Sequence, residues 1–200
     1  MKTKSQLLPI GILGLLLLGC GGGPAYVRGS EVPDLDKATM STKLDKVDLE
    51  KLFKENSASF EKSGLVRKWK TSTKDIRLAI FPIRNETSEH IDSQLDTLLG
   101  KFETALINEG TVTVISRENQ RMLVEELKQQ RSAAYNPAQA AQLGKQLGAQ
   151  YFITGKITSS SEKTGSEKRV QYFLFMQALE IETGAVRWQA EANLTKGLIN

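Results

Sequence analysis

The sequence predicts a single α/β (α+β) domain in which helices pack on a mixed β-sheet. The chain has 200 residues, a length that suits one domain with appendages. Hydrophobic residues make up 40% of the chain and charged residues 25%, as in ordinary globular proteins. Helical and strand patterns follow one another in the order α, β, α, β, α, α, β, β, β, which favours helices covering a sheet.

Residues 1–19 have the organisation of a bacterial signal peptide. Lys2 and Lys4 form a short basic start, and an apolar run of about 12 residues ends at Leu18. A permanent membrane span needs roughly 20 apolar residues. The favoured interpretation is therefore a segment that is removed on export.

Cys20 follows this run and is the only cysteine of the chain. Leu17-Leu18-Gly19-Cys20 resembles the bacterial lipobox, whose cysteine receives a lipid before cleavage; an ordinary secretory signal is the alternative. The resemblance implies three acyl chains, and two or more hold a protein stably on a membrane, at about 0.8 kcal/mol per buried CH₂. The residue after Cys20 is not Asp, which by the usual sorting pattern indicates the periplasmic face of the outer membrane.

Residues 20–43 are expected to form the lipidated N-terminus and a flexible linker. They combine Gly, Ser, Thr and Pro with mixed charge and contain few large apolar residues. Fully extended, about 25 residues span at most ~80 Å, whereas a coil of that length averages about 28 Å. The folded domain is expected over residues 44–200.

Two amphipathic helices are predicted in the first half of the chain. One runs from about Asp45 to Glu61, and Gly64 is expected to end it. The other starts near Ile91, repeats apolar residues at i, i+4, i+7 and i+8, and closes at Gly110. The apolar faces consist of Leu49, Leu52, Phe53 and Phe60 in the first helix, and of Ile91, Leu95, Leu98, Leu99, Phe102 and Leu106 in the second.

The remaining elements follow from caps, turns and apolar runs. Ile76–Phe81 is expected to be a buried strand that Pro82 stops, and Arg84–Glu89 a polar loop. Val170–Ile181 carries large apolar residues on both faces and should lie inside the sheet. Further helices are predicted from Ser116 to about Arg131 and from Asn136-Pro137 to Gly148. Further strands are predicted at Val112–Ile115, Tyr151–Thr158 and Val186–Leu194, with a polar hairpin loop at Ser160–Glu167 and a tight turn at Glu182–Gly184.

Three stretches carry a family resemblance. Leu78–Asp92 includes the string Asn-Glu-Thr-Ser-Glu-His-Ile-Asp, Leu143–Ile157 passes from helix to strand, and Leu179–Trp188 forms a closing hairpin. Together they resemble the LpoB-type penicillin-binding protein activators, whose fold is TolB N-terminal-like, over roughly residues 45–195. The hairpin is also similar to CsgG-like and TolB-like domains.

The resemblance implies a non-enzymatic outer-membrane lipoprotein. Such a protein binds a regulatory domain of a bifunctional class A penicillin-binding protein and stimulates peptidoglycan synthesis. Well-known members have a long Pro-rich linker, whereas only Pro24 and Pro33 lie in the linker here. The alternative is an envelope assembly or secretion lipoprotein of the CsgG-like or TolB-like kind. A secretion channel would need membrane hairpins of about 9–11 alternating residues per strand, which the polar Lys156–Arg169 hairpin does not offer.

No catalytic, cofactor or metal site is expected. Ser-x-x-Lys strings start at Ser59 and Ser160, but the adjoining Lys163-Thr164-Gly165 lies in a predicted loop rather than in an acyl-transferase strand. Gly155-Lys156 lacks the following Ser or Thr of a phosphate loop. His90 is the only histidine and has no cysteine near it, so neither a metal site nor a general base is predicted.

The charge pattern leaves protein contact as the expected mode of binding. The formal net charge of +4 is too small to indicate nucleic acid. A basic stretch from Arg67 to Arg77 flanks Trp69; it is interpreted as a solvated edge with the indole packed inward, and alternatively as a protein-contact surface, because Trp and Arg are favoured interface anchors. The candidate partner contacts are Arg84, Asn85, Glu86, His90 and Trp69.

Overall fold

The computed structural model describes residues 37–38, 41–117, 145, 147–165 and 167–199. Two units divide the chain, Met1–Lys37 and Ala38–Asn200, and all described helices and strands belong to the second. The predicted signal peptide and Cys20 lie outside the described residues, as do nearly all of the two helices expected between residues 116 and 148. Within the described part, no helix combines the length and apolarity needed to cross a membrane.

Helix α1 (Lys46–Glu61) confirms the first predicted helix. It starts with a capping box, in which the Asp45 carboxylate accepts a hydrogen bond from the Asp48 amide (3.0 Å) and the Asp48 carboxylate accepts one from the Asp45 amide (3.1 Å). The predicted inward face is buried, and the Asn56 side chain donates to the Leu174 carbonyl (3.0 Å), which ties α1 to the sheet.

The prediction that Gly64 ends this helix is wrong. Lys62 ends α1, and Gly64 is instead the first residue of helix α2 (Gly64–Lys70). The Ser63 hydroxyl accepts a hydrogen bond from the Val66 amide (3.1 Å), so the chain starts a new helix where glycine alone suggested a stop.

Helix α3 (Asp92–Glu109) confirms the second amphipathic prediction. Its apolar residues from Leu95 to Leu106 are buried, and Ile91 before it is buried as well. Gly110 ends the helix at φ 70°, a conformation that glycine adopts without steric cost.

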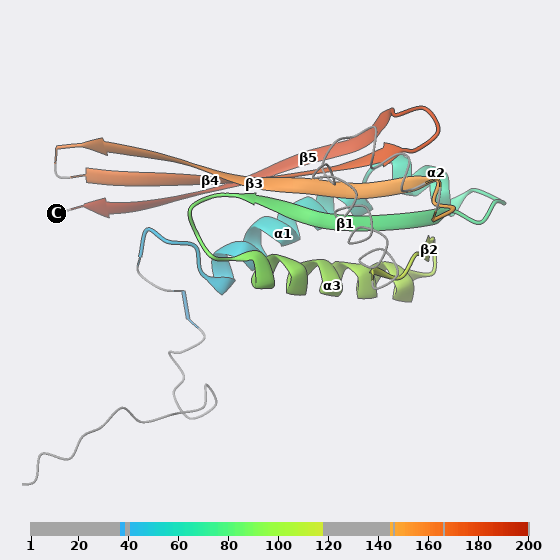
Figure 1. Cartoon of the computed structure of the whole chain (residues 1–200), viewed down its shortest axis with the longest axis horizontal. Helices are drawn as coiled ribbons and strands as arrows, with labels where there is room; N and C mark the ends of the chain where they lie inside the picture. Colours follow the sequence, from blue (N-terminus) through green and yellow to red (C-terminus); the bar gives the residue numbers. More distant parts are fainter. Residues whose placement is uncertain (1–36, 39–40, 118–144, 146, 166, 200) are drawn as a thin grey trace, which may run out of the picture. The chain divides into compact units, whose positions relative to one another are not determined.

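Five strands form one mixed sheet in the order β2-β1-β3-β4-β5, which confirms the predicted fold class (Figure 1). β1 pairs in parallel with β2 and β3, whereas β3, β4 and β5 pair antiparallel. β4 lies between β3 and β5, inside the sheet as predicted. The strand bounds are β1 Arg77–Glu86, β2 Thr113–Val114, β3 Tyr151–Thr164, β4 Glu167–Glu180 and β5 Val186–Ile199.

Pro82 does not stop the first strand, contrary to prediction. β1 continues to Glu86, and its register with β3 shifts between Ile80 and Ile83. Pro82 lies within this irregularity, where its missing N–H interrupts no regular ladder. Arg84, Asn85 and Glu86 therefore belong to a strand and not to the expected loop.

The predicted hairpin loop at Ser160–Glu167 is also wrong. β3 and β4 stay paired as far as Thr164 and Glu167, and the turn is confined to the residues between them. This end of the hairpin projects beyond α1 and α3 (Figure 1). Its side chains are solvated on both faces, so its composition is that of a loop although its backbone is a strand.

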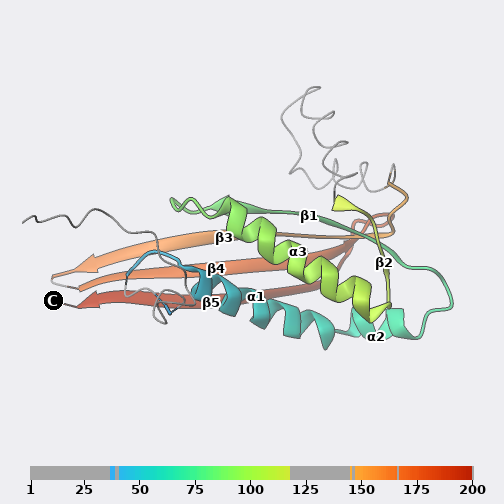
Figure 2. The ribbon, with the colours of Figure 1, turned by 90° about the horizontal axis from the view of Figure 1, so that it is seen from below.

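The main core lies between the sheet and the two long helices, which cover the same face (Figure 2). Phe60 is its centre, with ring centroids 5.8 Å from Trp69, 5.6 Å from Phe102 and 5.0 Å from Trp188, all in edge-to-face geometry. A smaller buried cluster lies on the other side of the strands and consists of Ala79, Phe81, Ala149, Phe152, Leu179 and Ile181.

Candidate protein-contact surface

The face of the sheet opposite α1 and α3 carries two rows of side chains across four strands. Each row consists of residues that are paired in register across β1, β3, β4 and β5. The second row starts two residues after the first on β1. Neighbouring strands are about 4.8 Å apart, so each row spans roughly 14 Å. We call this set the open-face patch: Arg84, Lys156, Phe175 and Glu191 in the first row, and Glu86, Thr158, Phe173 and Asn193 in the second.

Strand alternation places these side chains away from the helices. Leu174 and Met176, which flank Phe175 on β4, are fully buried in the main core. Ile157 on β3 and Ala192 on β5 are core residues as well. Since successive strand side chains point to opposite faces, the residues between them face away from α1 and α3.

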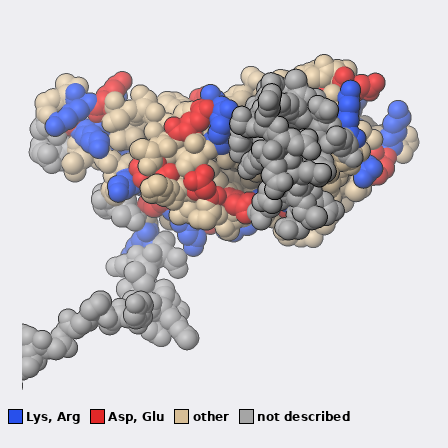
Figure 3. Space-filling view, viewed as in Figure 1, with Lys and Arg blue, Asp and Glu red and all other residues tan. Residues whose placement is uncertain are grey.

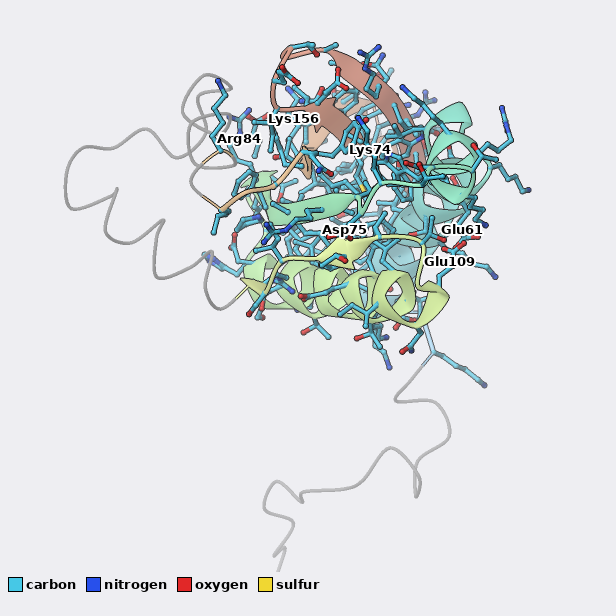
Figure 4. All side chains as sticks on the ribbon, turned by 90° about the vertical axis from the view of Figure 1, so that its right-hand side faces the viewer. Glu61, Lys74, Asp75, Arg84, Glu109 and Lys156 are labelled. Atoms are coloured by element: carbon cyan, nitrogen blue, oxygen red, sulfur yellow. The ribbon has the colours of Figure 1, made fainter. Side chains whose placement is uncertain are left out.

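The β1 end of the patch is held by ion pairs. Glu86 bridges two cations: one carboxylate oxygen pairs with the Arg84 guanidinium and the other lies 3.4 Å from the Lys156 ammonium. The three side chains are 33 to 45% exposed, so these pairs contribute little to stability. Figure 4 shows Arg84 and Lys156 close together, on the side of the ribbon away from Glu61 and Glu109.

The centre of the patch is aromatic. Phe173 and Phe175 are half-buried, whereas Glu191 and Asn193 beside them are exposed. Aromatic rings surrounded by polar and charged groups, with an arginine among them, match the composition of protein-contact sites. The geometry therefore offers a partner protein an apolar centre and a charged rim.

Two other predicted contacts are Asn85, near the end of β1, and His90, in the loop between β1 and α3. The Asn85 amide donates to the Glu89 carbonyl (2.7 Å) and to the Asp92 carboxylate (3.3 Å), and its oxygen accepts from Thr87. Asn85 thus shapes the loop by an Asx turn. His90 is exposed at the end of the loop, next to the start of α3.

Trp69 is 3% exposed and packs against Phe60 and Tyr151. Its indole is therefore packed inward, as expected from the sequence. The structure therefore brings Arg84 and Glu86 together on the open face and places Asn85 between them on β1. His90 lies in the adjoining loop, and Trp69 lies in the core.

Sequence reasoning missed most of the patch. Lys156 drew attention only through a weak similarity to a phosphate-binding loop. The residues of β4 around Leu174 are nearly all apolar, so the sequence does not indicate that Phe173 and Phe175 face the opposite side of the sheet. The signal that could have separated them is the polar alternation of β5, which leaves Glu191 and Asn193 on the face that these rings share.

The residues of the rejected chemical motifs are accounted for structurally. The Ser59 hydroxyl accepts a hydrogen bond from the Trp188 indole (3.3 Å), which joins α1 to β5. Ser160 and Lys163 are three residues apart on β3 and so face opposite sides. Among the described residues, no group of three or more His, Cys, Asp or Glu side chains could hold a metal ion.

The surface between α1 and α3 is concave. This groove of about 530 Å³ has buried Phe53 and Phe102 in its floor, and ion pairs bridge its rims, Lys101 to Glu50 (2.9 Å) and Lys70 to Glu109 (2.6 Å). Cationic and acidic side chains alternate along it. Figure 3 likewise shows described basic and acidic side chains interspersed over the visible face.

The sequence matches the family model described as peptidoglycan-synthase activator LpoB over residues 48–194. The chain belongs to this family. The match covers α1 and most of β5, and therefore the whole described fold between them. LpoB proteins are activators of peptidoglycan synthases rather than enzymes, so the general role of this protein is to regulate the synthesis of the cell wall.

Solved structures similar to this chain include two LpoB domains. The LpoB C-terminal domain from Salmonella enterica is 18% identical, with a TM-score of 0.48, over 74% of this chain and 98% of that one. The LpoB C-terminal domain from Escherichia coli is 18% identical, with a TM-score of 0.43, over 69% and 96%. Lipoprotein GNA1162 from Neisseria meningitidis is 12% identical, with a TM-score of 0.43, over 61% and 83%. The comparison with curated proteins gives no match.

Proposed function

We propose that this protein is an outer-membrane lipoprotein that binds and activates a bifunctional class A penicillin-binding protein through the open-face patch. It acts by contact and performs no catalysis. The observation that carries the proposal is the pair of aromatic rings beside Arg84 and Lys156 on a sheet face that neither α1 nor α3 covers. Membership of the activator family supplies the general role to which this surface is assigned.

The chemistry of the patch defines the partner surface. Phe173 and Phe175 supply apolar surface, and its removal from water in a complex stabilises that complex. Two cationic side chains, Arg84 and Lys156, lie at one end of the patch, so a complementary surface carries carboxylates opposite β1 and apolar side chains opposite β4. Interfaces of this kind gain most of their affinity from the central aromatic residues and gain specificity from the charged rim.

The N-terminal segments deliver this surface to the partner. We assign residues 1–19 to a cleaved signal peptide, 20–43 to a linker acylated at Cys20, and 44–200 to the periplasmic domain. A linker of this length reaches at most ~80 Å and averages about 28 Å as a coil. The synthase is therefore expected to extend from the inner membrane toward the outer membrane to meet the domain.

Glycan polymerisation by a purified class A synthase tests the proposal. The mature chain, with Cys20→Ser to keep it soluble, is expected to bind the synthase and raise its rate. Arg84→Glu with Lys156→Glu should abolish both effects, because it reverses the sign of the cationic end of the patch. The matched control, Lys51→Glu with Lys54→Glu, makes the same charge change on exposed positions of α1 and should leave stimulation within twofold of wild type.

Three outcomes would overturn parts of the proposal. No binding of any class A synthase by the wild-type chain, with recovery of secretion or Tol-type components from solubilised envelope, would replace activation by an assembly role. Equal loss in the patch variant and the α1 control would remove the assignment to the open face. Turnover of a wall precursor by the chain alone would make it an enzyme.

A further inference from the structure

Lys196 on β5 contacts Lys43, the last residue assigned to the linker, through a hydrogen bond. This β5 side chain is 12% exposed, and its ammonium lies 2.9 Å from the Lys43 carbonyl, 2.6 Å from the Asp48 carboxylate and 3.3 Å from that of Asp45. The three protons of an ammonium group are thereby directed at three acceptors around the start of α1. The chain is thus held to the sheet before the helix begins.

Tyr172 makes a second contact with the end of the linker, at Thr42, the residue before Lys43. Its hydroxyl, on β4, lies 2.9 Å from the Thr42 carbonyl and 3.2 Å from the Glu89 carboxylate. Burial and the nearby Glu89 charge raise the pKa of Tyr172 to about 12, so the phenol stays protonated and able to donate. Its single proton is directed to Thr42 by the shorter distance and is shared with Glu89, a residue of the β1–α3 loop.

The loop continues this chain of contacts toward the open-face patch. The Glu89 carbonyl accepts from the Asn85 amide, and the Glu89 amide donates to the Thr87 hydroxyl (3.1 Å), which itself donates to Asn85 (2.8 Å). Asn85 lies between Arg84 and Glu86 on β1. Hydrogen bonds, joined through the covalent structure of Glu89, therefore connect Thr42 and Tyr172 with the loop and with the strand that carries the patch.

We propose that Tyr172 is a positioning residue that couples the end of the lipidated linker to the β1–α3 loop beside the open-face patch. Release of Thr42 from the sheet removes one acceptor of the Tyr172 hydroxyl and changes how firmly that hydroxyl holds Glu89. The order of the loop then depends on whether the linker end is docked. The relevance of this coupling to activation rests on the proposed function, whereas the coupling itself does not.

Backbone amide hydrogen exchange on the mature chain, residues 20–200 with Cys20→Ser, tests the coupling without any synthase. Tyr172→Phe removes only the hydroxyl and keeps the ring in the core. It is expected to speed exchange of the Lys43 amide, whose acceptor is the Ser41 hydroxyl, and of the Glu89 amide, each at least fivefold. Amides of β5 opposite β4 serve as the internal reference and should change less than twofold.

Tyr151→Phe is the matched control, because it removes a buried-core tyrosine hydroxyl that bonds Glu180 (3.4 Å) far from the linker along the β3–β4 pair. It should leave both reporter amides within twofold of wild type. Glu89→Ala in the Tyr172→Phe background should add less than its effect in wild type, since each substitution by itself breaks the Tyr172–Glu89 hydrogen bond. Additive effects, or acceleration of only one of the two reporter amides, would show that the two segments are not coupled.

Synthase binding then separates the two proposals. Tyr172→Phe is expected to weaken binding about fivefold, with Tyr151→Phe unchanged. A wild-type chain that binds no synthase defeats the proposed function while leaving the exchange result to decide the coupling. Coupled exchange together with an unchanged affinity of Tyr172→Phe would overturn the positioning role in activation.

Discussion

The same strands build both faces of the sheet, but the two faces differ in how deeply their side chains are buried. On β4, Leu174 and Met176 are fully buried under the helices, whereas Phe173 and Phe175, the residues between them, remain half-exposed on the other side. The apolar character of both sets is similar, so the difference comes from what lies opposite. Burial under α1 and α3 places the main core on one face, whereas the other face carries the smaller buried cluster and the half-buried rings of the open-face patch.

Truncation of neighbouring residues on β4 is expected to give the largest contrast. Leu174→Ala should lower the free energy of unfolding by about 3 kcal/mol, because it leaves a cavity in the core. Phe175→Ala should lower it by about 1 kcal/mol, because part of that ring is already in water. Urea unfolding measures both values, and only the Phe175 variant should lose synthase binding while folded. Equal destabilisation by the two changes would contradict the division between the faces.

Two glycines provide the next contrast. A Cβ at Gly155 would overlap the Phe175 carbonyl oxygen and lie 3.2 Å from Met176 Cγ, in the middle of the sheet. Gly155→Ala is therefore expected to cost about 2 kcal/mol of unfolding free energy. Gly197→Ala, where the nearest atom to a new Cβ is the Lys168 carbonyl oxygen at 3.8 Å, should stay within about 0.5 kcal/mol of wild type in thermal unfolding. A tolerated Gly155→Ala would contradict the close packing of β3 and β4.

The ion pairs of the open face should matter for binding and hardly for stability. Glu86→Gln removes the bridge between Arg84 and Lys156 but is expected to change the unfolding free energy by less than about 0.5 kcal/mol, since all three side chains are solvated. Synthase binding should become more dependent on ionic strength, because the substitution removes one negative charge beside Arg84 and Lys156. Titrations at low and high salt measure this, and an unchanged salt dependence would argue against the cationic end of the patch.

The smallest expected effect is confined to the β4–β5 turn. Hydrogen bonds from Thr183 (2.6 Å) and Arg187 (2.6 Å) lower the pKa of Glu180 below its ordinary value of 4.5. A lowered carboxyl pKa stabilises the fold above the ordinary pKa, and the contribution is lost as pH falls through the lower folded value. Arg187→Gln should raise the pKa of Glu180 toward 4.5 in an NMR titration of its carboxyl carbon. A pKa that does not move would assign the shift to the hydrogen bonds from Thr183 and Tyr151.

Local patterns were sufficient for α1, for α3 and for the family. The apolar spacing of α1 and α3, the glycine after α3 and the strings around Leu78–Asp92 depend on residues close together in the chain, so the sequence alone predicted them correctly. Periodicity and capping are local properties that a single chain displays directly. The predicted ends of strands were wrong where pairing with a neighbouring strand determines them. Pro82 is tolerated because β1 shifts register against β3, and Ser160–Thr164 is a strand because β4 pairs with it.

The contact surface was only half predictable for the same reason. Arg84 and Glu86 were found because they are polar residues within a specific string, but Lys156, Phe173 and Phe175 become their neighbours only when three strands align. Likewise, nothing near Tyr172 in the sequence indicates Thr42 or Glu89, which lie 130 and 83 residues away. The sequence by itself determined the two long helices and the family, since each rests on local spacing. Tertiary structure decided which side of each strand meets a helix and which distant residues share a hydrogen bond, because both depend on the pairing of remote segments.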